Sequence, residues 1–270
     1  MKPVRIAIII LLFLLVSLAV VFFWPGKSSE PPSISELGIP PVALQGAEPE
    51  IRYPLPEAQP VSPGTEEQAI PPLPELGQSD VFTKDLLTQL FGEPARKQLL
   101  APQQFIRRLV LIIDALPRKD LPRQHLPLRA PGGRFETAGE EGAKVIASAN
   151  FRRYVPYVKL AEAAPTERLT KAYLRVYPLL EEAYQEMGHP KGYFHDRMIA
   201  VLDHLLATPE PKGSIPLVKH VTQYRYVDPQ LESLSAGQKT LLRMGSENAR
   251  RVKAVLQKLR GQLVVPQPVT

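Results

Sequence analysis

The sequence contains no cysteine and only one tryptophan among its 270 residues. Without cysteine, neither a disulfide nor a thiolate metal site can stabilise the fold. Three catalytic patterns are also missing: a Ser-His-Asp order, a phosphate-binding glycine loop and an HExxH motif. No activity can therefore be assigned from a motif alone.

Charge, glycine and proline are all absent between Ile6 and Trp24, IAIIILLFLLVSLAVVFFW. As a helix this stretch is roughly 28 Å long, close to the ~30 Å hydrocarbon core of a bilayer. Lys2 and Arg5 precede it and Lys27 alone follows closely, so the positive-inside rule leaves the N-terminus in the cytoplasm. The sequence thus predicts a single-pass anchor in a bacterial inner membrane, with the rest of the chain in the periplasm.

A cleaved signal peptide is the alternative interpretation of this stretch. Signal peptides have an apolar core of about 7–15 residues, followed by small residues at the cleavage site. Here the apolar run is longer and ends in the bulky residues VFFW. These features favour an uncleaved anchor, with Trp24 at the membrane interface.

Residues 25–78 differ from the rest of the chain in composition. They contain repeated prolines and two basic against eight acidic side chains. Because proline removes backbone donors and fixes φ, we expect a disordered, extended tether that does not pack. This tether is either a plain spacer or a proline-rich ligand for a partner domain.

The remaining residues, 79–270, carry 29 basic and 19 acidic side chains, a net charge of +10. A charge of this size predicts an anionic partner. Outside the inner membrane the candidates are anionic phospholipid, peptidoglycan carboxylates, lipopolysaccharide phosphates and an acidic protein face. Nucleic acid is not expected as a partner there, and no cofactor is predicted.

Apolar periodicity predicts a mainly α domain over residues 79–263, followed by a frayed tail at 264–270. About seven helices are expected, within residues 79–92, 102–116, 150–164, 166–187, 193–207, 235–244 and 246–263. The second is apolar nearly all round, which indicates a central helix, and its Asp114 is predicted to be a capping or salt-bridged residue rather than a functional carboxylate. The predicted N-caps are Ser79, Asn150, Thr166, Ser246 and Ser235, the last in a capping box with Gln238. Glycines at 92, 188 and 245 are expected to end helices.

Two segments predict a small antiparallel sheet beside these helices. Residues 134–147 fit a hairpin with a GEEG turn at 139–142. Residues 217–227, LVKHVTQYRYV, are rich in Val and Tyr and lack Gly and Pro. They therefore predict one further strand, which could add to the hairpin.

Three segments carry a resemblance to a known family: GGRF, GYFHDRMIAVLDHLLATPEP and LSAGQKTLLRMGSENARRVKAVLQKLR, in this order behind the apolar stretch and the proline-rich segment. In this arrangement the chain resembles the bacterial domain-of-unknown-function family numbered 3014, over about residues 79–263. The resemblance implies a single-pass envelope protein of Gram-negative bacteria and supplies no catalytic residues. The family pattern has Asn where this chain has His195, which argues against an essential role for that imidazole.

Carboxylates and imidazoles concentrate on the predicted helix 193–207. Asp196 and Asp203 lie two turns apart on one face, with His204 beside them. One interpretation is a hydrolase built on these three residues, superficially like the HD phosphohydrolases, but a second HD pair is missing from the sequence. The favoured interpretation is structural: Asp196 interacts with the helix dipole, and Asp203 pairs with Arg197 or His204.

Basic residues form two further groups. Arg129 and Arg134 lie in and beside the proline-rich loop after the second helix, where their planar forks could bind carboxylate or phosphate. Arg250, Arg251 and Lys258 lie mostly off the apolar stripe of the last helix and predict salt-sensitive binding to an anionic surface. Solvated charges without a partner are the alternative for both groups.

The sequence therefore predicts a membrane-anchored binding or scaffolding module that faces the periplasm, with a periplasmic hydrolase as the alternative. No metal ligand is predicted. The candidate binding residues are Arg129, Arg134, Tyr193, Asp196, Arg197, Asp203, His204, Arg250, Arg251 and Lys258.

Overall fold

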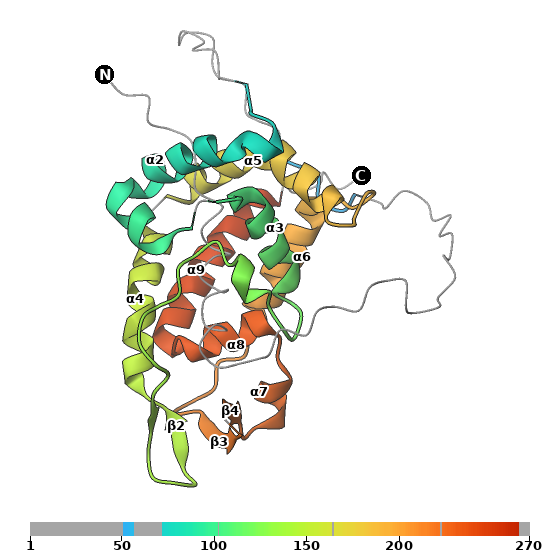
Figure 1. Cartoon of the computed structure of the whole chain (residues 1–270). Coiled ribbons are helices and arrows are strands. Elements are labelled where there is room, and N and C mark those ends of the chain that lie inside the picture. Colours follow the sequence, from blue (N-terminus) through green and yellow to red (C-terminus); the bar gives the residue numbers. More distant parts are fainter. Residues whose placement is uncertain (1–50, 57–71, 102, 164, 222, 265–270) are drawn as a thin grey trace, which may run out of the picture.

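The computed structural model describes residues 51–56, 72–101, 103–163, 165–221 and 223–264. In these ranges the chain forms eight α-helices and one four-stranded antiparallel sheet (Figure 1). The helices are α2 (Ser79–Leu99), α3 (Phe105–Ala115), α4 (Ser148–Glu162), α5 (Thr166–Glu186), α6 (Phe194–Leu206), α7 (Pro229–Ser233), α8 (Ala236–Arg243) and α9 (Ser246–Leu263). The predicted mainly α domain with a small antiparallel sheet is confirmed.

None of the helices within those ranges is long and apolar enough to cross a membrane. The predicted anchor at 6–24 lies outside the described residues, as do most of the predicted tether and the tail beyond Val264. The anchor, the tether and the tail therefore stay predictions.

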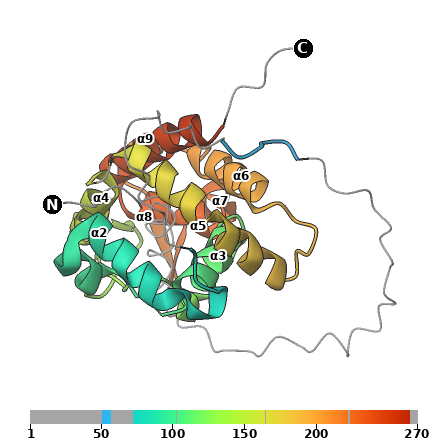
Figure 2. The ribbon, with the colours of Figure 1, turned by 90° about the horizontal axis from the view of Figure 1, so that it is seen from above.

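Two helices, α3 and α9, connect most of the other helices of the bundle, and α9 keeps one exposed face. α9 contacts α4, α5, α6 and α8, and α3 contacts α2, α5 and α6. Figure 1 shows α9 running along the bundle, with the sheet at one end beyond α8, and the view from above in Figure 2 shows α9 along one side of the bundle. The prediction that α3 is a central helix is confirmed, because its apolar side chains are buried on several sides: Phe105, Leu109, Val110, Ile112 and Ile113.

The first predicted helix does not end at Gly92. Gly92 adopts φ 76° and ψ 155°, which interrupts the helix, but the chain then resumes and α2 continues to Leu99. Pro94 lies at the start of the resumed part, where a missing N–H needs no helical partner. Gly92 thus bends the helix instead of ending it.

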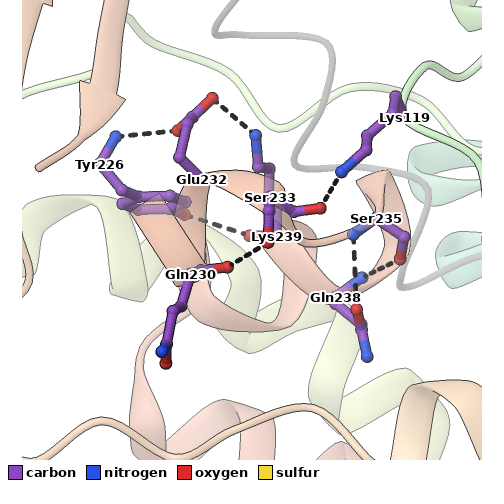
Figure 3. Close-up of polar contacts among 8 residues, drawn as sticks. All are labelled: Lys119, Tyr226, Gln230, Glu232, Ser233, Ser235, Gln238 and Lys239. Atoms are coloured by element: carbon purple, nitrogen blue, oxygen red, sulfur yellow. Dashed lines mark hydrogen bonds and ion pairs between the residues drawn. The ribbon is translucent and has the colours of Figure 1, made fainter. Parts of the chain in front are cut away.

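Local helix signals near α8 are confirmed. The Ser235 hydroxyl accepts the N–H of Gln238 at 3.2 Å, and the Gln238 side-chain oxygen accepts the N–H of Ser235 at 3.4 Å, which completes the capping box (Figure 3). Gly188 and Gly245 follow the ends of α5 and α8 with φ of 105° and 85°. Both have the left-handed conformation that favours glycine after a helix.

The other predicted N-caps are wrong. Thr166 and Ser246 are themselves the first residues of α5 and α9. Ser79 donates its hydroxyl to a carbonyl three residues earlier. Asn150 lies inside α4 and bonds both the N–H and the C=O of Glu136, so it ties the hairpin to this helix.

The sheet has the strand order β1 (Thr137–Ala138), β2 (Lys144–Ile146), β3 (Pro216–His220) and β4 (Gln223–Tyr226), and every pair is antiparallel. The hairpin and the strand added to it are confirmed, but a single strand over 217–227 is wrong. The chain reverses after His220, and Val221 adopts φ 54°. A β-branched residue rarely adopts this conformation, so the sequence contains no usual turn signal here.

Candidate functional site

Residues 51–56 of the predicted tether lie against the N-terminal end of α6. Arg52 donates its backbone N–H to Asp196 Oδ2 at 3.0 Å, and Tyr53 donates its own to Asp196 Oδ1 at 2.8 Å. Leu55 donates its N–H to the Tyr193 hydroxyl at 3.1 Å. We call Tyr193 and Asp196 the docking pair.

The local sequence makes this docking complete. Residues 54 and 56 are prolines without a backbone N–H, so the docking pair accepts all three backbone N–H groups of residues 52–56. Tyr53 and Leu55 are partly buried against the main hydrophobic core. These residues depart from the expectation of a tether that does not pack, and Leu76, at the end of the same predicted tether, is buried as well.

The position of Asp196 in the first turn of α6 suits it to this task. A carboxylate near a helix N-terminus is stabilised by the helix dipole, and it accepts hydrogen bonds on both oxygens. The dipole interaction predicted for Asp196 agrees with this placement. Asp196 also accepts a hydrogen bond from a residue 143 positions earlier. Nothing in the sequence around Asp196 predicts this second role.

A buried aromatic cluster lies beside the docking pair. The ring of Tyr193 is centred 6.1 Å from both the Tyr177 and the His195 rings. His195 Nε2 lies 3.2 Å from the Leu263 carbonyl oxygen, which can only accept, so Nε2 carries the hydrogen and Nδ1 accepts from the Tyr173 hydroxyl at 2.8 Å. Burial lowers the pKa of His195, and the imidazole is therefore neutral in this role.

Glu181 of α5 holds the start of α6 in place. One of its carboxylate oxygens accepts both the Tyr177 hydroxyl at 2.5 Å and the N–H of Phe194 at 3.0 Å. Burial is the main cause that raises the pKa of Tyr177, and this hydrogen bond raises it further. The docking pair therefore stands on a helix end whose position is defined by α5.

Asp114 and Arg197 form a second polar contact between α3 and α6. Asp114 is buried, and Arg197 donates to its Oδ1 at 2.8 Å and to its carbonyl oxygen at 2.6 Å. Arg118 pairs with the other carboxylate oxygen. The predicted salt-bridged role of Asp114 is confirmed, whereas Arg197 is occupied by Asp114 and does not pair with Asp203.

The other two residues of the hypothetical hydrolase have separate partners. Asp203 pairs with Arg260 of α9, with Oδ2 3.1 Å from Nη2, so its predicted pairing with Arg197 or His204 is wrong. His204 Nε2 lies 2.8 Å from the Ser235 hydroxyl. Ser235 is the N-cap of α8, and the residue is only 5% exposed. Among the described residues, no three His, Cys, Asp or Glu side chains are placed to hold a metal.

Part of the predicted basic surface is occupied by carboxylates. Arg251 donates two hydrogen bonds to the Glu162 carboxylate, while Arg250 and Lys258 are exposed on α9. Arg129 donates to the Lys97 carbonyl at 3.1 Å. Arg134 is exposed before the hairpin, so the structure does not bring the basic candidates together with the docking pair.

A cavity of about 300 Å³ lies between the sheet, the 208–215 segment and the starts of α4 and α9. Its lining is mainly apolar and includes Val145, Phe151, Ile215 and Leu241. None of the predicted binding residues lines this cavity. It has the size for a small apolar ligand.

Sequence reasoning selected both members of the docking pair but missed the segment that they bind. The usable signal was short: in IRYPLPE, apolar Ile51, Tyr53 and Leu55 alternate with other residues inside a mostly acidic tether. Such alternation is typical of an extended segment with one apolar face.

The comparisons with known proteins add a family and no activity. A family model described as "Protein of unknown function (DUF3014)" matches residues 105–260, more than half of the chain. No curated protein and no solved structure matches the sequence.

Proposed function

Because the chain belongs to the DUF3014 family of proteins of unknown function, we propose its role from its geometry. We propose a membrane-anchored binding module of the bacterial envelope, with residues 6–24 as a single-pass inner-membrane anchor and the helical domain in the periplasm. The observation that carries the binding role is the capture of three backbone N–H groups by Tyr193 and Asp196.

The docking pair suits one class of ligand, an extended protein segment spaced by proline. Its hydrogen bonds go to backbone, which every sequence offers, while partly buried side chains such as Tyr53 and Leu55 supply selectivity. Proline stiffens such a segment, so less conformational entropy is lost when it binds. A partner segment with the same spacing of apolar residues and prolines would fit the same place.

The tether itself is then a competitor for that partner. A segment on the same chain acts at an effective concentration on the order of mM, so an external segment must bind more tightly or be held nearby. Docking also limits the reach of the domain. The extended tether spans roughly 165 Å over residues 25–78, but only roughly 85 Å over residues 25–51, at ~3.1 Å per residue.

A peptide competition experiment tests the binding role. The full-length chain with Arg52→Pro and Leu55→Pro loses two of the three N–H donors while the docking pair stays intact. A labelled peptide of residues 50–58 should bind this variant more tightly than it binds the wild type. Adding Asp196→Ala should remove that binding. Equal affinity for all three chains would refute the proposal.

The matched control is Arg52→Ala, which keeps the N–H and removes only an exposed side chain. This variant should behave as the wild type does. Membrane topology needs a separate assay: protease added to spheroplasts should digest the domain before lysis. Digestion only after lysis would reverse the orientation that we propose.

A further inference from the structure

A small cavity of about 40 Å³ lies where the loop after α3, strand β4 and helices α7 and α8 meet. Lys119 and Arg123 come from the loop after α3, Arg225 from β4, and Lys239 and Arg243 from α8. Five basic side chains therefore line one cavity, although they come from three separate segments.

Two acidic side chains, Asp120 and Glu232, also line this cavity, which leaves an excess of three positive charges. Glu232 is already engaged on both oxygens: it accepts the N–H of Tyr226 at 2.9 Å and pairs with Lys239 at 2.7 Å (Figure 3). Lys119 donates to the carbonyl of Ser233. The acidic side chains thus offset only part of the basic charge.

The positive charges of Arg123 and Arg243 repel each other in this cavity. Burial lowers the pKa of Arg123, and the positive charge of Arg243 lowers it further, although Asp120 acts in the opposite sense. Arg243 also hydrogen-bonds the hydroxyl of buried Tyr226, which defines its position. An anion in the cavity would offset this repulsion between guanidinium groups.

We propose that the cavity lined by Arg123, Arg225 and Arg243 binds a carboxylate group. Its volume of about 40 Å³ corresponds to roughly three water-sized positions at ~10–15 Å³ each, and a carboxylate has three heavy atoms. Arginine's planar fork matches a carboxylate through two parallel hydrogen bonds. The carboxylate comes either from the C-terminus of a peptide or from a small free acid. This site is separate from the docking pair and does not depend on its role.

The experiment uses the full-length chain in a neutral detergent and follows backbone amide shifts of Tyr224, Arg225 and Ala236 by NMR. Four probes are titrated at constant ionic strength with chloride: acetate, the dipeptide Ala-Ala, its C-terminal amide, and inorganic phosphate. Acetate and Ala-Ala should give saturable shifts, and the amide should give none. Tighter binding of Ala-Ala than of acetate identifies a peptide C-terminus, and the reverse identifies a small free acid.

Two variants make the result specific. Arg123→Gln should weaken carboxylate binding about tenfold or more, since a charge-assisted hydrogen bond is lost. Arg225→Gln changes an exposed strand residue, so it tests the site without a risk to folding and should also weaken binding. Arg168→Gln removes the same charge from an exposed position on α5, outside the cavity, and should leave the affinity unchanged. Shifts that chloride reproduces, tighter binding of phosphate, or equal effects of all three variants would each overturn the assignment.

Discussion

Asp196→Asn provides the sharpest test of the docking geometry. The side chain keeps its shape but loses its charge and one acceptor. Asp196 accepts from Arg52 at 3.0 Å and from Tyr53 at 2.8 Å. An amide offers only one oxygen to these two donors, and its NH₂ group would face the other N–H.

The size of the effect follows from those two bonds. A hydrogen bond to a charged group contributes about 1.5–3 kcal/mol and a neutral one about 0.5–1.5 kcal/mol. In the variant one charged hydrogen bond is lost and the other becomes neutral. Because the bond from Arg52 is exposed, water replaces part of it, and we expect a loss of docking free energy at the lower end of what these values allow. A loss of about 2 kcal/mol shifts the docking equilibrium about 30-fold toward release.

Hydrogen exchange measures this equilibrium directly. Protection of the amides of Arg52, Tyr53 and Leu55 should fall about 30-fold in Asp196→Asn, while core amides of α9 keep theirs. The absence of cysteine also permits a fluorophore at Arg52→Cys, whose anisotropy should fall on release.

The matched control is Glu182→Gln, an exposed carboxylate on α5, which should change neither readout. Unchanged protection at residues 52–55 in Asp196→Asn, with the fold intact, would refute the reasoning.

Three further predictions concern stability and surface charge. Burial lowers the pKa of His195, so its imidazole is protonated first in the unfolded chain. The melting temperature should therefore fall as the pH drops below about 6.5, and less steeply in His195→Gln than in the wild type or the exposed control His220→Gln. Asp114→Asn leaves two guanidinium groups facing a neutral side chain, so urea unfolding should show a free energy of unfolding lower by about 2–3 kcal/mol. A loss below about 0.5 kcal/mol would show that solvent replaces the contact. A chain that begins at residue 25 should bind anionic vesicles in a salt-sensitive way, and Arg250→Glu with Lys258→Glu should abolish this binding without a change in helicity. Binding that persists in half-molar salt would contradict the prediction.

Features that depend on neighbours in sequence could be predicted. The capping box joins Ser235 to Gln238 three residues on, the β1–β2 hairpin closes over a short glycine turn, and α3 is apolar nearly all round. In each case the interacting groups lie within a few residues, or the burial follows from composition alone. The prediction of an anionic partner also rests on composition, which does not say where on the domain an anion would bind.

Contacts between distant residues were decided by the tertiary structure. Asp203 turned out to pair with Arg260 because α6 packs on α9, whereas local spacing favoured its neighbours on the same helix. The turn at Val221 arises from strand pairing, since the residue itself disfavours that conformation. The docking of residues 52–55 is the clearest case. Any non-proline residue has an N–H to donate, so only the fold determines which three of them meet Tyr193 and Asp196.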